Sequence, residues 1–304
     1  MTFVRLGGVA HHVVVDGTGP VCVLAAGLGM SWFDWDPVVP LLAAHRTVVR
    51  FDRPGHGLSA PAAAPHTAAG EADRIAALLD ALRLPGPATV VGHSIAGFHA
   101  EAFARLHPAR TAALVLVDSS VEERPRVFRT APPLARALGA VLSAAGIPAA
   151  LGPAGRGLAV RLSARGQDTA PPALVRRVYR TSRVLRGTLD ENARYGAVAA
   201  EVLALRERAP LPPGLPVTVL AAPDGSARWE RRQRALARRL GARYEAAEPS
   251  GHLVMLDRPD LVAGAVLRRA QETPDEQTSD RETADRETPD QGSPVPERVA
   301  QEGA

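Results

Sequence analysis

Ser94 lies between a short apolar run, Ala88-Thr89-Val90-Val91, and a helical pattern that follows without a spacer. On such a strand-to-helix turn the hydroxyl projects at the carboxyl edge of a sheet, and the first amides of the helix point at any negative charge that forms there. Gly92 and Ala96, two positions before and after, are small enough for strand and helix to approach. These residue types predict a serine nucleophile, although a serine at this place is also a favoured helix cap.

The run Gly92-His93-Ser94-Ile95-Ala96-Gly97 resembles the G-x-S-x-G nucleophile elbow of the α/β-hydrolase family, with alanine in place of the last glycine. Residues 52–59, DRPGHGLS, are similar to the D-x-R-G-x-G-x-S loop that the family carries after the same strand. The resemblance covers roughly residues 3–270. It implies an α/β-hydrolase fold with a helical cap and acyl transfer by a serine.

A serine nucleophile needs a base that takes its proton and a carboxylate that orients the base. The family's chain order is serine, acid, histidine. His252 follows the last predicted strand, and Asp224 follows the strand Val217–Ala221, so we predict a triad of Ser94, Asp224 and His252. Asp118 also ends a strand beside the nucleophile and is the alternative acid.

The resemblance implies an oxyanion hole made by the main-chain amides of Leu28 and Ile95. Leu28 lies in the loop AGLG, where the family often has H-G-x-G. The missing histidine removes no chemistry, because the donor is a backbone amide. The predicted substrate-pocket residues are Gly27, Gly29, Trp32 and Met255, although large side chains such as the last two are more often part of the core or the rim.

The elements around these residues predict an α/β fold, with a mostly parallel twisted sheet of about eight strands and helices on both faces. Residues 3–15 predict an antiparallel edge hairpin, and residues 34–44 a helix. Some ninety residues, 119–213, show helical stretches broken by prolines and no strand pattern, more than one crossover needs. The predicted domains are a core of residues 1–118 and 214–270, a helical cap of residues 119–213 and a disordered acidic tail of residues 271–304.

The charge of the chain is unevenly distributed. All 36 basic residues are arginines, and the net charge is +4. Residues 271–304 hold ten acidic residues and three arginines, a net charge of −7, which leaves +11 for residues 1–270. The arginines of the body are scattered and not interleaved with aromatic residues, so we expect solvated surface and no nucleic-acid partner.

The sequence shows no signal-peptide pattern and no run of eighteen apolar residues, so we expect a cytoplasmic protein without stable membrane insertion. Its single cysteine, Cys22, is typical of a small buried side chain. No metal-ligand cluster, phosphate-binding loop or dinucleotide fingerprint occurs in the sequence. We therefore expect catalysis without metal or cofactor on a small-molecule substrate, and the oligomeric state stays open.

The resulting prediction is a serine hydrolase that cleaves a carboxylic ester or a related acyl bond through an acyl-enzyme. Carbon–carbon bond hydrolase, aminopeptidase or amidase, lactonase and cofactor-free perhydrolase use the same residues and stay open. A small-molecule receptor on a hydrolase scaffold is the non-enzyme alternative, disfavoured because a receptor needs no complete triad. An aspartate nucleophile, as in dehalogenases and epoxide hydrolases, is disfavoured by Ser94.

Overall fold

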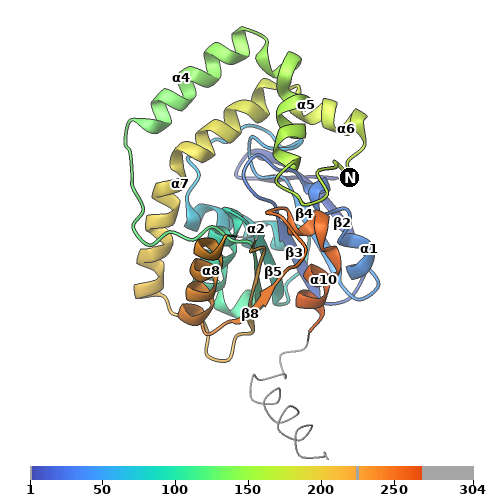
Figure 1. The fold of residues 1–304 in the computed structure, drawn as a ribbon, viewed down its shortest axis with the longest axis vertical. Helices are drawn as coiled ribbons and strands as arrows, with labels where there is room; N and C mark the ends of the chain where they lie inside the picture. Colours follow the sequence, from blue (N-terminus) through green and yellow to red (C-terminus); the bar gives the residue numbers. More distant parts are fainter. Residues whose placement is uncertain (1, 224–225, 269–304) are drawn as a thin grey trace, which may run out of the picture. The chain divides into compact units, whose positions relative to one another are not determined.

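The computed structural model describes residues 2–223 and 226–268 of the chain. These residues form an eight-stranded sheet (Figure 1). In chain order its strands are β1 (Thr2–Leu6), β2 (Val9–Asp16), β3 (Val21–Ala25), β4 (Thr47–Phe51), β5 (Ala88–His93), β6 (Thr111–Val117), β7 (Val217–Ala221) and β8 (Arg243–Ala246).

The strand order is β1-β2-β4-β3-β5-β6-β7-β8, and the parallel strands β3, β5, β6 and β8, which precede Leu28, Ser94, Asp118 and His252, end at one edge of the sheet. β2 is antiparallel to both β1 and β4, and the remaining neighbours are parallel. The predicted edge hairpin and mostly parallel sheet are therefore confirmed. Every residue of β3 and β5 is buried, as their continuous apolar runs predict for strands covered on both faces.

Helices cover both faces of the sheet and enclose two apolar clusters. On one face Leu78, Phe103 and Leu236 belong to the cluster, and on the other Leu42, Met255 and Val262 do. The core helices are α1 (Val39–Leu42), α2 (Ala68–Ala81), α3 (Ala96–Leu106), α8 (Ala227–Leu240), α9 (Val254–Asp257) and α10 (Pro259–Leu267), with short 3₁₀ turns at η1 (Trp32–Trp35) and η2 (Pro108–Arg110).

The helix predicted over residues 34–44 is wrong in its extent. The structure has the 3₁₀ turn η1, a break and only four residues of α1. Pro37 lies in the break, and Pro40 lies in the first turn of α1. Proline lacks the N–H that continues a helix, which accounts for the interruption.

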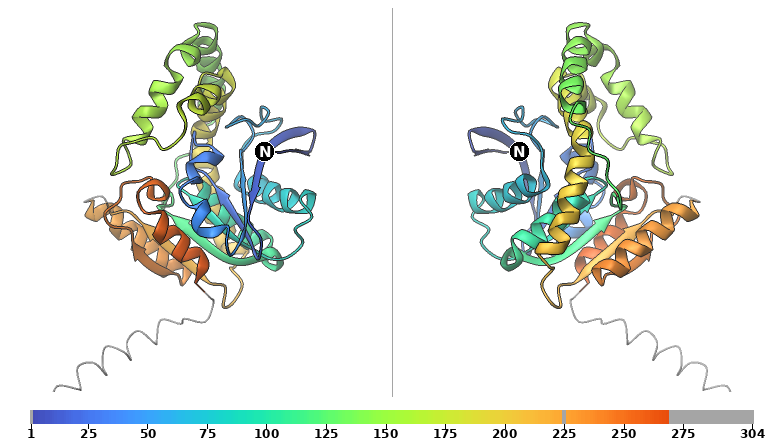
Figure 2. Two further views of the ribbon diagram at one scale, coloured as in Figure 1. Left: turned by 90° about the vertical axis from the view of Figure 1, so that its right-hand side faces the viewer. Right: turned by 90° about the vertical axis from the view of Figure 1, so that its left-hand side faces the viewer.

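The insertion between β6 and β7 is helical, as predicted. Its helices are α4 (Ala131–Ala144), α5 (Ile147–Val160), α6 (Pro172–Tyr179) and α7 (Ser182–Arg208). Both views of Figure 2 show α4 to α6 above the sheet. A Cβ added to Gly187 of α7 would lie 2.7 Å from the Gly55 carbonyl oxygen. The backbone of this helix is therefore in direct contact with the backbone of the loop that follows β4.

Core and cap belong to one compact unit that extends to Arg268. The division into residues 1–118 and 214–270 against 119–213 stays a prediction, and the predicted tail, residues 271–304, lies outside the described residues. In the described part of the chain no single helix has the length and apolar composition to cross a membrane, and α4 and α5 meet that criterion only as a pair bent by 110°.

Candidate active site

Ser94 lies at the tip of the turn from β5 to α3, with a φ of +54°. A non-glycine residue rarely adopts this left-handed backbone, which costs on the order of 1–3 kcal/mol. Main-chain hydrogen bonds hold it there, because its amide donates to Val117 (3.1 Å) and its carbonyl accepts from Gly97 (2.9 Å) and Ser120 (3.0 Å). The side chain is partly exposed, and its hydroxyl has no hydrogen-bond partner within the described residues.

The small residues around the turn are required by close contacts. A Cβ on Gly92 would lie 2.3 Å from the Ala96 carbonyl oxygen, and a Cβ on Gly97 would lie 2.0 Å from Ser119 Oγ. Ala96 itself is buried without strain in the apolar cluster. The second glycine that this turn needs is thus Gly97, which explains why alanine is accepted at the position before it.

Asp118 and His252 are in direct contact. Asp118 Oδ2 accepts a hydrogen bond of 2.5 Å from His252 Nδ1. The other carboxylate oxygen, Oδ1, accepts from the Trp229 indole (2.8 Å) and the Ala222 amide (3.1 Å), so the carboxylate is fixed from two further sides. The Asp118 side chain is 3% exposed and that of His252 is 30% exposed, which leaves the imidazole accessible from the solvent side.

The two candidate acids differ in what the structure describes. Asp224 lies outside the described residues, so its assignment stays a prediction. Asp118 follows β6, has a φ of +38° and is the acid found at His252. Trp229, on α8, was not identified from the sequence, because a tryptophan in an arginine-rich helix carries no signal for a contact with a distant carboxylate.

His93 supports the loop that carries His252. Its Nε2 lies 2.9 Å from the His252 carbonyl oxygen, and the two rings are 4.7 Å apart. Burial and the neighbouring His252 lower the pKa of His93 well below its usual value, so the ring is neutral. Since a carbonyl only accepts, Nε2 carries the proton and donates it.

The predicted oxyanion amides are available. Within the described residues, the main-chain N–H groups of Leu28 and Ile95 form no hydrogen bond. The loop of Leu28 is held through its carbonyls, because the Tyr179 hydroxyl of the cap donates to the Gly29 carbonyl (3.0 Å). Gly29 has a φ of +67°, and a Cβ there would lie 3.1 Å from Thr188 of α7.

A buried ion pair joins the same loop to the cap. Arg53 Nη1 donates to the Ala26 carbonyl, and Nη2 donates to the Gly27 carbonyl and to Glu191 of α7 (2.9 Å). Its Nε donates to the other carboxylate oxygen of Glu191 (2.7 Å). Burial opposes ionisation of Glu191, but Arg53 and then His56 keep its pKa well below the usual value. Arg53 lies in the loop of residues 52–59, which was identified from the sequence. Nothing in the sequence distinguishes Glu191 from a solvent-exposed helix residue.

The loop before His252 is also attached to the cap. Asp257 accepts hydrogen bonds from the Gly251 amide (2.9 Å), the Ser163 hydroxyl (2.7 Å) and the Ala164 amide (2.7 Å). Burial opposes the effect, but these hydrogen bonds lower the pKa of Asp257. A Cβ on Gly251 would lie 2.2 Å from the Leu162 carbonyl oxygen, so cap and loop meet without space for a side chain.

The predicted pocket residues divide into two groups. Gly27 and Gly29 lie on either side of Leu28, whose amide is the predicted oxyanion donor, and Gly27 faces the His93 ring. Trp32 is packed against His12 and Phe33, and Met255 is fully buried among the apolar residues below the sheet. A role for these two side chains as pocket walls stays a prediction.

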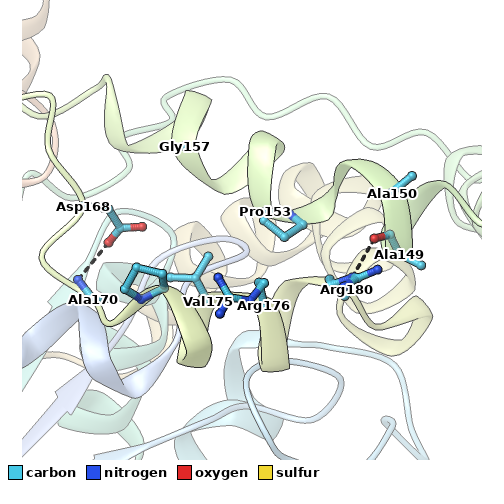
Figure 3. A pocket seen from close by; sticks show the side chains of 10 residues that line it. Ala149, Ala150, Pro153, Gly157, Asp168, Ala170, Val175, Arg176 and Arg180 are labelled. Carbon is cyan, nitrogen blue, oxygen red and sulfur yellow. Dashed lines mark hydrogen bonds between the residues drawn. The ribbon is translucent and has the colours of Figure 1, made fainter.

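A cavity of about 600 Å³ lies between α5 and α6 in the cap (Figure 3). Asp168, Arg176 and Arg180 line it with small and apolar residues, and none of the predicted site residues does. It is therefore a feature of the cap and separate from the Ser94 site. Within residues 2–223 and 226–268, no group of three or more His, Cys, Asp or Glu side chains is arranged to hold a metal ion.

Known proteins resemble this chain in sequence and in fold. The profile described as Alpha/beta hydrolase family matches residues 22–265. The chain is 33% identical over 249 residues to the lipase LipV of Mycobacterium tuberculosis, covering 77% of this chain and 84% of that protein. A putative carbamate hydrolase, RutD, of Caulobacter is 40% identical over 108 residues, but the match spans only 35% of this chain and 40% of that protein.

Among solved structures, the enol-lactonase from Burkholderia xenovorans has a TM-score of 0.66 and 24% identity, covering 88% of this chain and 98% of that one. This likeness extends over core and cap and concerns the fold. A family profile over most of the chain, a relative matched over most of its length and a serine on a strained strand-to-helix turn lead to one conclusion. The chain belongs to the α/β-hydrolase family.

Proposed function

We propose that this protein is a serine hydrolase that cleaves a carboxylic ester through an acyl-enzyme on Ser94, with His252 as the base and Asp118 as the acid. The observation that carries the proposal is the 2.5 Å hydrogen bond from His252 Nδ1 to the buried Asp118 carboxylate. It fixes the imidazole with Nδ1 protonated, which leaves Nε2 as the proton acceptor.

In the proposed reaction Ser94 Oγ attacks the ester carbonyl while His252 Nε2 takes the hydroxyl proton. The negative charge on the carbonyl oxygen is received by the free amides of Leu28 and Ile95. The tetrahedral intermediate collapses, the alcohol leaves with the proton from His252, and the acyl group stays on Ser94. Water, activated by the same imidazole, then releases the carboxylic acid and restores the serine.

The acid is proposed as Asp118 because its carboxylate meets two requirements of the role. It is bonded to the base, and its second oxygen is held by Trp229 and Ala222, so it cannot rotate away. Without this carboxylate, the imidazole would lose the group that orients it and the negative charge that stabilises its protonated form. Asp224 remains the competing assignment and is compared directly below.

The choice of an ester follows from the relatives. LipV is named a lipase, and the fold is shared with an enol-lactonase, and both names refer to cleavage of carboxylic ester bonds. The putative carbamate hydrolases match too small a part of the chain to direct the choice.

A fluorophosphonate probe with intact-mass detection tests the nucleophile. We expect one adduct, mapped to the peptide of Ser94, and no adduct in Ser94→Ala. A series of nitrophenyl esters of increasing acyl length then tests the bond and the acyl size. An adduct without hydrolysis of any ester would redirect the search to amides, lactones or carbon–carbon bonds, and folded protein without an adduct would support the receptor alternative.

A further inference from the structure

The segment of the cap from Val127 to Leu162 exposes apolar side chains in an unusual concentration. Of the twelve large apolar residues that are most exposed in the described chain, eight lie within residues 127–162, and Leu134, Val141 and Leu158 are each about two-thirds exposed. Exposed apolar residues scattered singly are ordinary, whereas a gathered set marks an interaction surface. The eight residues are Val127, Phe128, Leu134, Leu138, Val141, Leu151, Leu158 and Leu162.

The packing of α4 against α7 turns Leu134 and Val141 away from α7. Gly139 is buried, and a Cβ there would lie 3.0 Å from Arg186 of α7. Leu134 and Val141 are on the opposite side of the helix from Gly139, because each residue advances about 100° around the axis. Figure 1 shows α4 along the edge of the cap, away from the sheet, and α5 running from its end toward the core.

The inner side of α5 is fixed to the body of the protein. Arg156 is buried and forms ion pairs with Asp34 of the core and Asp168 of the cap. A Cβ on Gly152 would lie 1.8 Å from the Tyr179 carbonyl oxygen, so α5 packs directly on the end of α6. Leu151 and Leu158 of the same helix stay exposed, so the helix cannot bury both sides within this chain.

The same segment carries positive charge without negative charge. Residues 124–167 contain no Asp or Glu. Six of the arginines in this segment are exposed, and within the described residues their side chains have no hydrogen-bond or ion-pair partner. They are Arg124, Arg126, Arg129, Arg136, Arg161 and Arg165, which together with the eight apolar residues we call the outer cap face.

We propose that the outer cap face docks on an anionic phospholipid surface. Apolar side chains between exposed arginines are the pattern of helices that lie in a membrane interface, where the hydrocarbon takes up the apolar groups and the headgroups neutralise the cations. This inference rests on the cap alone and is independent of the reaction at Ser94.

Other occupants would match either the apolar side chains or the positive charge of this surface, but not both. A second copy of the chain would bring like charges together. Residues 271–304 are acidic but contain only Val295 and Val299 as large apolar residues, too few to cover eight. Lipid of negative charge matches both components at once.

Flotation of the full chain with vesicles of known composition tests the proposal. We expect binding to phosphatidylcholine vesicles with about 30% phosphatidylglycerol, at least tenfold weaker binding to pure phosphatidylcholine, and a comparable loss in about 0.5 M NaCl. Absence of binding to the anionic vesicles, or binding that salt does not change, would overturn it.

Matched variants separate this surface from general positive charge. Arg124→Gln/Arg126→Gln/Arg129→Gln should weaken binding on the order of a hundredfold, at about fivefold per arginine. The control Arg231→Gln/Arg238→Gln/Arg239→Gln removes the same charge from exposed residues of α8, which has no large exposed apolar side chain, and should weaken binding about threefold at most. Equal losses in the two triple variants would contradict a specific face.

An uncharged variant tests the apolar component. Leu134→Gln/Val141→Gln/Leu158→Gln keeps the net charge and should still reduce binding at least tenfold, because those side chains would enter the interface. Circular dichroism and melting temperature check that each variant is folded. Light scattering of the full chain tests the alternative, and a dimer that this variant dissociates would assign the face to a second copy instead.

Discussion

The sheet edge at Ser94 and the inner side of the cap use polar side chains in opposite ways. At the sheet edge the Ser94 hydroxyl and the amides of Leu28 and Ile95 have no partner within the described residues, and His252 is 30% exposed. At the contact between core and cap, Glu191 is wholly buried and engaged by Arg53. The groups predicted to meet a substrate keep free atoms, whereas Arg53 and Glu191 use all of their charged atoms in hydrogen bonds.

The comparison indicates that the cap supports the main chain of the candidate site. Tyr179, Glu191 and Ser163 of the cap reach, directly or through one residue, the two loops that carry the oxyanion amide and His252. An α/β-hydrolase cap is expected to select substrates, and this one is also attached to the main chain of the site. Loss of these contacts should therefore change turnover as well as substrate preference.

The largest effect is expected at the nucleophile. Ser94→Ala should lower kcat about 10⁴-fold or more with little change in melting temperature, because removal of one member disables a unit that acts together. Steady-state kinetics on the best nitrophenyl ester measures it. Ser120→Ala, the same change at a neighbouring serine, is the control and should keep most of the activity. Appreciable turnover in Ser94→Ala would mean that another group attacks the substrate.

The acid should show the next largest effect. Asp118→Asn should lower kcat by about 10³ to 10⁴-fold, because the amide favours the wrong tautomer of His252 and does not compensate the imidazolium charge. Asp224→Asn, assayed on the same ester, should cost less than tenfold. The reverse ranking would return the acid to Asp224.

The ion pair between core and cap should affect stability first and turnover second. Glu191→Gln leaves Arg53 as a buried unpaired charge and should lower the free energy of unfolding by about 3–5 kcal/mol, with a loss of kcat of about tenfold from a displaced oxyanion loop. Urea unfolding and kinetics measure the two effects.

The double variant Arg53→Met/Glu191→Leu distinguishes positioning from stability. Replacing a buried ion pair by apolar residues is often neutral for stability. We expect recovery of the melting temperature without recovery of kcat, because the carbonyls of Ala26 and Gly27 still lack their donor. A stable double variant with wild-type turnover would show that the pair serves folding alone.

The smallest effect concerns His99, beside this ion pair on α3. Within the described residues neither ring nitrogen has a partner, and burial lowers its pKa to about 4 from an ordinary 6.5. Between these values the unfolded chain binds a proton that the folded chain does not, so stability falls as the pH is lowered through this range. From pH 7 to pH 5 the loss from His99 should be about 2 kcal/mol.

Unfolding by urea at a series of pH values measures this dependence. His99→Leu removes one titrating group and should reduce the slope between pH 7 and pH 5 by the share of His99. The buried His93, whose pKa is also lowered, keeps the remaining slope in this variant. Below about pH 5, protonation of the buried carboxylates Glu71 and Glu191 lowers stability further. An unchanged slope in His99→Leu would assign the dependence to another group.

Residues adjacent in sequence determined much of this protein. The run from Ala88 to Gly97 contains strand, turn and helix start together, so the place of Ser94 follows from local rules of chain geometry. The continuous apolar runs predicted the buried parallel strands, and the long segment without strand pattern predicted the helical insertion. His252 was found because it follows the last strand, which brings it to the shared carboxyl edge.

Only the tertiary structure decided which distant groups touch. Asp118 and Asp224 both follow strands that end at the same edge, and sequence order cannot rank two such positions; the fold put Asp118 against His252. The burial of Glu191 and the exposure of Leu134 also could not be predicted from the sequence. The glutamate is buried and the leucine is exposed, because burial depends on which side of a helix meets the body of the protein, and that contact is made by residues far apart in the chain.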